Sequence, residues 1–235
     1  MFTVRSSKYA AGLWSDSMID DLLWRAGPSK VRPNWRAPTW SWASNGQSIS
    51  YSDAPFFWHP DEATEDRPPY EHISMVLGVQ TRASFQDEFG ELDSGELRLR
   101  SRCAKATLQY WGPNDLGIRL EKETRPSRGQ KGMTYAVQMS DGSGYQIIPD
   151  YALEKPSPDF VPTGEEVLCV LISVASYSNN SHARRTLNLL VLTRAGAEEE
   201  QYERIALFIV DENKGQDINA VLETFPEEMR DLTII

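Results

Sequence analysis

Apolar and polar residues alternate along much of the chain from residue 73 onward. Ile73, Met75, Leu77 and Val79 occupy every second position, and Leu97 and Leu99 repeat the pattern further on. Side chains at alternate positions of a strand point to the same face, so this spacing predicts strands with one buried side. Segments rich in β-branched and aromatic residues predict further strands at 104–111, 134–139, 144–148, 166–177, 185–193 and 202–210.

Turn residues separate these predicted strands. Asp141-Gly142 lies between 134–139 and 144–148, which predicts a tight hairpin. The two most apolar windows, Val167–Val174 and Leu187–Leu192, are expected to form the centre of the sheet as a second hairpin. Polar, proline- or glycine-containing segments at 52–70 and 112–131 are predicted to be connections. About eight to ten strands in series, joined by hairpins, indicate an antiparallel sandwich or barrel.

Two short helices complete the predicted fold. Residues 15–28 have Ser17 followed by Asp20, in the manner of a capping box, and end at Gly27-Pro28. Residues 217–225 place Ile218, Val221 and Leu222 on one side. The expected fold class is therefore mainly β: an antiparallel β-sandwich or barrel-like sheet with a short N-terminal helix and a C-terminal helix.

The N-terminal segment is unusually rich in tryptophan, with six of the chain's seven tryptophans in residues 1–58. Residues 39–44 alternate like a strand, so Trp40 and Trp42 are expected on one face, with a return strand at 48–51 after Asn45-Gly46. We expect residues 1–58 to pack onto a β body at 59–235, so that 9–235 form a single domain. Most of the tryptophans Trp14, Trp24, Trp40 and Trp42 are expected to be buried. Arg36 or Arg204 is expected to pack on one of them.

Composition and charge narrow the possible functions. The 235 residues include 40% hydrophobic and 25% charged residues, which excludes a disordered chain. The net charge of −10 argues against nucleic acid as a partner, although residues 1–58 carry +2 against −12 in the rest. Basic residues interleave with tryptophans there, but packing of a local core is favoured over binding of single-stranded nucleic acid. No apolar run is long enough for a membrane span, and two cysteines favour a cytoplasmic protein.

No residue pattern indicates catalytic chemistry. His59, His72 and His182 lack metal-ligand spacing, although the segment His59–Glu62 could hold a metal weakly. Cys103 and Cys169 are expected to pack as small apolar residues. The acidic group Asp87, Glu88, Glu91 and Asp93 is expected to be a solvated turn. We therefore expect no catalytic residue, no cofactor and no metal site, and a protein that is not an enzyme.

Several segments resemble the heterokaryon-incompatibility (HET domain) proteins of fungi. The resemblance begins with Tyr9–Trp14 and Leu22–Trp24 and is most specific in Arg36–Ser44, which reads RAPTWSWAS. Weaker matches follow at 95–99, 167–172 and 202–208. Thr39 and Ala206 replace the serine and glycine usual in the family. The motif residues carried over from the resemblance are Trp14, Trp24, Arg36, Pro38, Trp40, Trp42, Ser44, Tyr202 and Arg204.

The resemblance also implies a role. In the family these segments follow an N-terminal HET domain, the death-inducing part with a TIR-like fold. Eight residues precede Tyr9, so we expect the region that follows the HET domain, without that domain. It would be a non-catalytic regulatory or interaction module in non-self recognition and control of programmed cell death. Its partner would be a protein, either the effector domain or a related incompatibility protein.

Two alternatives stay open at this point. The first is a carbohydrate-binding or hydrolytic β-sandwich protein that uses Trp35, Trp40 or Trp42 as an exposed sugar platform. The second is an inactive, truncated remnant.

Overall fold

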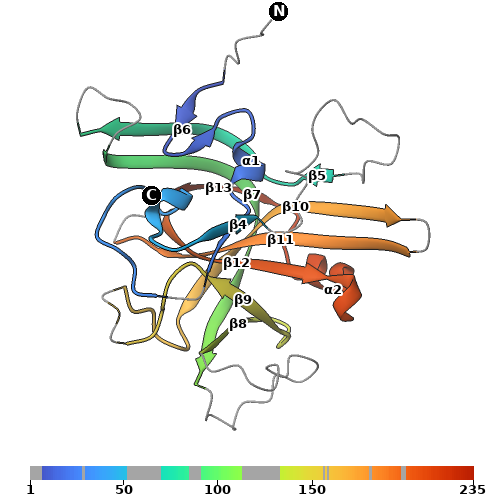
Figure 1. The fold of residues 1–235 in the computed structure, drawn as a ribbon. Helices are drawn as coiled ribbons and strands as arrows, with labels where there is room; N and C mark the ends of the chain where they lie inside the picture. The colour runs from blue at the N-terminus through green and yellow to red at the C-terminus, as the bar shows by residue number, and fades with distance from the viewer. Residues whose placement is uncertain are drawn as a thin grey trace, which may run out of the picture.

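The computed structural model describes residues 7–27, 30–51, 70–84, 91–112, 133–155, 157, 159–179, 182–196 and 200–235. The predicted connections at 52–70 and 112–131 lie outside these residues except for their end positions 70 and 112. The described chain is mainly β, with a large antiparallel sheet, so the expected fold class is confirmed (Figure 1). None of its helices is long and apolar enough to cross a membrane.

In the described part of the chain, nine strands form the main sheet, in the order β13-β7-β8-β9-β12-β11-β10-β5, with β6 paired to β7. Two additional pairings, β7 with β10 and β12 with β13, join strands at distant places in this order. The strands are β5 (Tyr70–His72), β6 (Met75–Ala83), β7 (Leu92–Trp111), β8 (Thr134–Met139), β9 (Gly144–Pro149), β10 (Glu166–Asn179), β11 (His182–Arg194), β12 (Gln201–Asp211) and β13 (Met229–Ile234).

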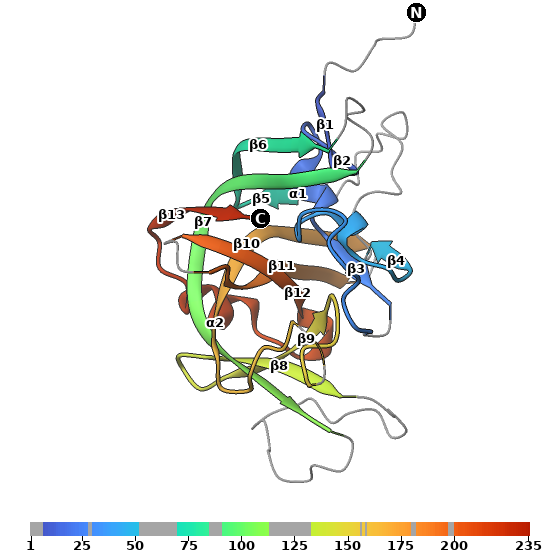
Figure 2. The ribbon, with the colours of Figure 1, turned by 90° about the vertical axis from the view of Figure 1, so that its left-hand side faces the viewer.

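The long strand β7 closes the sheet into a barrel. Its second half pairs with β8 on one side and with β10 on the other, so the path β7-β8-β9-β12-β11-β10 returns to β7. Its first half pairs instead with β6 and β13. Figure 2 shows β7 curving from one end of the molecule to the other. The segments around 97–99 and 104–111, expected as two strands, are thus parts of one strand.

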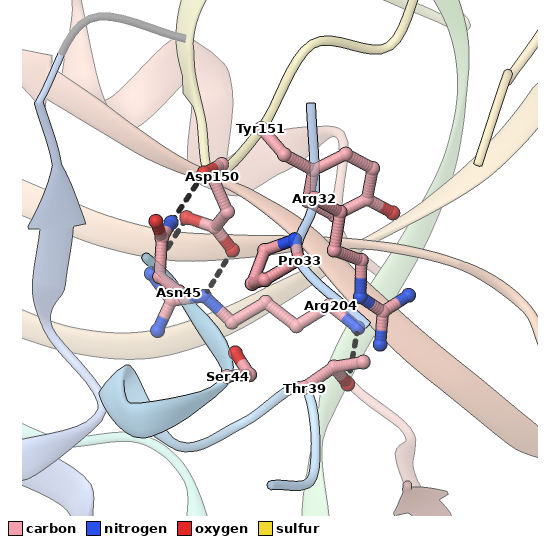
Figure 3. A pocket seen from close by; sticks show the side chains of 8 residues that line it. All are labelled: Arg32, Pro33, Thr39, Ser44, Asn45, Asp150, Tyr151 and Arg204. Atoms are coloured by element: carbon pink, nitrogen blue, oxygen red, sulfur yellow. Dashed lines mark hydrogen bonds and ion pairs between the residues drawn. The ribbon is translucent and has the colours of Figure 1, made fainter. Parts of the chain in front are cut away.

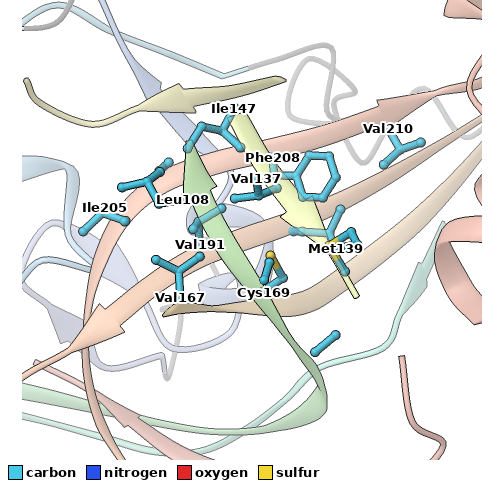
Figure 4. Packing of buried hydrophobic residues seen from close by; sticks show 14 of the residues in the cluster. Leu108, Val137, Met139, Ile147, Val167, Cys169, Val191, Ile205, Phe208 and Val210 are labelled. Atoms are coloured by element: carbon cyan, nitrogen blue, oxygen red, sulfur yellow. The ribbon is translucent and has the colours of Figure 1, made fainter. Parts of the chain in front are cut away.

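The segments 167–175, 187–192 and 204–208 of β10, β11 and β12 are buried on both faces of the sheet, which explains their continuous apolar sequences. Cys169 and Leu171 point into the barrel core, which also contains Leu108, Val137 and Phe208 (Figure 4). Val170 and Ile172 point to a second core on the opposite face, together with Leu97, Leu99 and Trp40. The predicted central position of 167–174 and 187–192 is therefore confirmed, and Cys103 and Cys169 are buried free thiols.

Local signals in the body of the chain were reliable. The β8–β9 hairpin turns at Asp141-Gly142, where Gly142 has a φ of +85° and Asp141 accepts a hydrogen bond from Ser143 N. The helix α2 (Ile218–Glu223) begins after Asp217, whose carboxylate accepts hydrogen bonds from Asn219 N and Ala220 N. A short 3₁₀ helix, η3 (Glu212–Lys214), precedes it. Strand β13 was not predicted from the sequence.

The N-terminal block, residues 7–51, differs from expectation. Its elements are β1 (Tyr9–Ala10), β2 (Leu13–Trp14), α1 (Met18–Asp21), β3 (Trp24–Ala26), η1 (Trp42–Ser44) and β4 (Ile49–Tyr51). The predicted helix at 15–28 forms only one turn, and its second half becomes β3, which pairs with β4. Asp21, rather than Asp20, accepts the hydrogen bonds of Ser17 Oγ and Trp14 N.

The prediction of a strand at residues 39–44 is wrong. Residues 39–41 form a turn, and η1 follows because the Ser41 side chain accepts a hydrogen bond from Ala43 N and caps it. Trp40 is consequently fully buried, whereas Trp42 is exposed, so the two indoles do not share a face. The alternation of tryptophan with small residues imitates a strand, but the hydroxyl of Ser41 is used to form a helix cap.

Candidate functional site

A buried polar site with many hydrogen bonds surrounds Arg204 on β12. This side chain is fully buried and its guanidinium makes four hydrogen bonds. Nε donates to Asp150 Oδ2 at 2.8 Å and Nη2 donates to Asp150 Oδ1 at 3.2 Å (Figure 3). Nη1 donates to Leu22 O and Nη2 to Trp24 O, each at 2.6 Å. The guanidinium carbon also lies 3.5 Å from the centroid of the Trp24 ring.

Burial acts in opposite directions on the two charges. It raises the pKa of Asp150 and lowers the pKa of Arg204, because each charge is removed from water. Their mutual attraction and their two hydrogen bonds oppose both shifts. An ion pair of this kind is tolerated in a core when its remaining donors are also satisfied. The backbone carbonyls of Leu22 and Trp24 satisfy them here, so the pair connects the N-terminal block to the barrel.

Thr39 extends this network to the C-terminus. Its hydroxyl accepts a hydrogen bond from Arg204 N at 3.0 Å and donates to Ile235 O. Thr39 N also donates to Ile235 O, at 3.0 Å. Nearby, Trp24 Nε1 donates to Trp40 O at 3.0 Å. The turn at 39–41 is thereby attached to β12, to the last residue and to Trp24.

The next two residues hold the β1–β2 hairpin. Ser41 Oγ donates to Ala11 O, and Trp42 Nε1 donates to Gly12 O at 3.1 Å. Ala11 and Gly12 have positive φ values of 50° and 93°. A Cβ at Gly12 would lie 2.9 Å from Trp42 Cε2, so the indole packs directly on this glycine. We call the contacts around Arg204, Thr39 and Ser41 the buried joint.

The structure brings most of the resemblance motif to this joint. Trp24, Trp40 and Arg204 are fully buried in or beside it, and Arg204 packs on Trp24 as expected. Pro38 is buried and packs directly on Gly95. A Cβ built on Gly95 would lie only 2.3 Å from Pro38 Cγ. Ser44 Oγ donates to Ser41 O at 2.7 Å. The segments Tyr9–Trp14, Leu22–Trp24, Arg36–Ser44 and Tyr202–Phe208 thus meet in space.

Other motif residues lie outside the core of the joint. Arg36 is exposed, so Arg204 alone fulfils the expected packing on tryptophan. Tyr202 is buried on β12 beside β13. Trp14 is 38% exposed and Trp42 is 39% exposed, so the expectation that most of the four tryptophans are buried is wrong. The reason is that Trp14 takes the outward position of β2, next to the inward-pointing Leu13.

A cavity of about 10 Å³ lies within the joint, large enough for about one water molecule. Arg32 beside it lies over the Tyr151 ring and pairs with Glu203 at 2.9 Å and with Asp159 at 3.6 Å. The cavity is lined by Arg32, Pro33, Thr39, Ser44, Asn45, Asp150, Tyr151 and Arg204 (Figure 3). This arrangement can hold backbone segments together, but it has no room for an organic ligand.

Sequence reasoning missed Asp150, Thr39, Asn45 and Arg32 as members of this site. One signal was available: Arg204 directly precedes the apolar run 205–210, and a buried arginine requires an acceptor. Asp150 is 54 positions away in the chain, so only the folded structure could identify it as that acceptor.

Other candidate chemistry is sparse among the described residues. They contain no group of three or more His, Cys, Asp or Glu side chains placed to hold a metal ion. His72 Nε2 lies 2.9 Å from Asp20 Oδ1, while His59, Asp87 and Glu88 fall outside the described residues. Burial raises the pKa of the Cys103 and Cys169 thiols to about 12.

Three tryptophans in the N-terminal block are exposed although their rings are held in place. Trp14, Trp35 and Trp42 are 38%, 46% and 39% exposed, and we call them the exposed indoles. Trp35 Nε1 donates to Leu92 O at 2.7 Å, which ties its ring to β7. Trp14 makes an edge-to-face contact with Tyr9 at 5.3 Å, and Trp42 rests on Gly12. Each ring therefore presents apolar surface to solvent in a defined orientation.

Comparisons with protein-family models, with curated proteins and with solved structures found no match to this chain.

Proposed function

We propose that this chain is a non-catalytic protein-interaction module, and that the exposed indoles are its contact residues. The observation that carries the proposal is the 38–46% exposure of three tryptophans whose rings are already held by the fold. Tryptophan is strongly enriched among residues that dominate binding energy at protein interfaces. A ring held before binding loses little further freedom, so more of its contact energy contributes to affinity.

The buried joint supports the same proposal. It fixes the N-terminal block on the barrel through Arg204, Thr39 and Ser41, and therefore fixes the positions of Trp14 and Trp42. On this view, the segments that resemble the fungal incompatibility proteins maintain a scaffold. The partner proposed from that resemblance is a HET effector domain or a related incompatibility protein, and the role is control of cell death in non-self recognition.

Isothermal titration of the purified chain with a purified HET domain tests the proposal. Trp14→Ala and Trp35→Ala should each weaken binding by about tenfold or more, because an interface hot spot contributes more than about 1.4 kcal/mol. Met229→Ala is the matched control, since Met229 on β13 is 38% exposed, the same fraction as Trp14. Absence of measurable binding, or binding that all three variants leave unchanged, would contradict the proposal.

The burial of Trp40 weakens the carbohydrate-binding alternative, because Trp40 is one of the three tryptophans expected to form an exposed sugar platform. Trp35 and Trp42 are still exposed, so an aromatic platform of two rings can be tested. Titration with soluble oligosaccharides should then change tryptophan emission, and Trp35→Ala should abolish the change. Emission that does not respond to any sugar, in a chain that does bind the HET domain, would decide between the two functions.

A further inference from the structure

Among the described residues, strand β6 has a strand partner on one edge alone. It pairs with β7 along one side, and no described residue outside β7 makes a hydrogen bond to the backbone of residues 75–83. The nine residues of β6 extend over roughly 30 Å at the usual rise per residue. Figure 1 shows β6 and the first half of β7 together as an arm at the periphery of the fold. An edge of this length can accept a strand from another chain.

Two register irregularities limit the part of the edge that is regular. One lies between Val76 and Gly78 and the other between Arg82 and Ala83. Between them, the segment Gly78–Arg82 pairs without interruption with Arg98–Ser94 of β7. The regular window therefore has five residues, and Gln80 is its centre.

We infer that β6 pairs with β6 of a second copy of this chain, antiparallel and with the two-fold axis at Gln80. This register places Gln80 opposite Gln80 of the other copy, Val79 opposite Thr81 and Gly78 opposite Arg82. It also places the irregularity at 76–78 of each copy opposite the irregularity at 82–83 of the other. The five-residue ladder consequently ends at the same point on both strands, which a strand of unrelated sequence would not ensure.

Charge and space agree with this register. Arg82 is the one charged residue of the window, and it meets glycine rather than another charge. A Cβ built on Gly78 has no atom within 4 Å, so the arriving arginine side chain has room above this position. On β7, Arg98 lies in the row of Gly78 and Glu96 in the row of Gln80. Arg82 brings its own counter-ion, because its Nε lies 3.4 Å from Asp93 Oδ2 of the same copy.

The inner face of β6 also favours a second copy. Val76 and Val79 are only partly buried and pack at the margin of the second core. In the inferred pairing, Thr81 and Val79 of the other copy extend this face and remove more of that apolar surface from water. The inference goes beyond the proposed function, because it uses the β6 edge and none of the exposed indoles.

Sedimentation equilibrium of charge variants at Gln80 tests the pairing. The unchanged chain should sediment as a dimer, whereas Gln80→Lys and Gln80→Glu should each weaken dimerisation at least tenfold, because like charges then face each other at the axis. An equimolar mixture of the two variants should restore dimers, since lysine then faces glutamate. Gln80 is exposed, so neither change should disturb the fold, which circular dichroism verifies.

Gln138→Lys is the matched control. Gln138 is an exposed glutamine on β8, where both neighbouring strands, β7 and β9, are already paired. This variant should remain dimeric. A monomeric unchanged chain, a dimer insensitive to Gln80→Lys, or a variant mixture that stays monomeric would each overturn the inference.

Discussion

The guanidinium carbon of Arg204 lies 3.5 Å from the centroid of the Trp24 ring, although the two residues are 180 positions apart in the chain. The same guanidinium donates to the backbone carbonyl of Trp24 and to the carboxylate of Asp150. One side chain thus joins three parts of the molecule: the N-terminal block, the end of β9 and the central strand β12. The stability of the N-terminal block should therefore depend on Arg204.

Replacement of Arg204 by methionine should lower the free energy of unfolding by about 3–5 kcal/mol. The change leaves the carboxylate of Asp150 buried without its cation, and the carbonyls of Leu22 and Trp24 lose their donors. Urea denaturation followed by circular dichroism measures the effect. Arg98→Met, at an exposed arginine of β7, is the control and should change stability by no more than about 0.5 kcal/mol.

The double variant Arg204→Met/Asp150→Leu separates the cost of an unpaired charge from the loss of packing. Removal of both charges should recover part of the stability lost in Arg204→Met, because no charge is then left unpaired in the core. Equal costs for Arg204→Met and Arg98→Met would show that the joint does not stabilise the fold.

Replacement of Gly12 by alanine should destabilise the protein more than the same change at Gly142. Both glycines have positive φ, 93° and 85°, so both substitutions incur a backbone cost of roughly 1 kcal/mol. At Gly12 the new Cβ would also lie 2.9 Å from the Trp42 ring, whereas at Gly142 it would meet no atom within 4 Å. The difference between the two urea midpoints measures the packing of Trp42 on the hairpin.

Gly12→Ala should in addition make tryptophan emission more accessible to iodide, because the displaced Trp42 ring moves toward solvent. Gly142→Ala should leave iodide quenching unchanged. If the two variants unfold at the same urea concentration, the Trp42–Gly12 contact contributes nothing beyond the backbone.

Stability should fall as the pH rises from about 9 toward 12. Burial raises the pKa of the Cys103 and Cys169 thiols from 9.0 to about 12, and that of Tyr51 from 10.0 to about 12. In the unfolded chain these groups lose their protons at lower pH than in the folded chain. The stability linked to them is therefore complete below the unfolded pKa and is lost as the pH rises through this window. Urea midpoints between pH 7 and 11 measure the loss.

The variant Cys103→Ala/Cys169→Ala should lose less stability over the same pH range, because only Tyr51 among these three groups still titrates. In the unchanged protein at neutral pH, neither thiol should react with a thiol reagent until the chain unfolds. Rapid labelling of the native protein would contradict the burial of these cysteines.

Local sequence patterns predicted the secondary structure correctly where one periodicity, either helical or strand-like, continues along the whole segment. The β8–β9 hairpin, the β10–β11 hairpin, β12 and α2 were predicted because alternation, turn residues and a helix cap act over a few neighbouring residues. The same reasoning failed at residues 39–44, where Trp40 and Trp42 alternate like strand residues. The Ser41 hydroxyl instead caps η1 and binds Ala11 O, an interaction with a residue 30 positions away.

The residue pattern alone predicts that the chain is mainly β, where its central hairpins lie and which apolar runs form the sheet centre. These properties follow from side-chain periodicity and backbone preferences within short segments. The folded structure was needed to show how β7 closes the barrel, that Arg204 pairs with Asp150 and which tryptophans face solvent. Those properties depend on which distant segments cover each face, because burial of a charge or an indole is determined by neighbours that the local pattern does not contain.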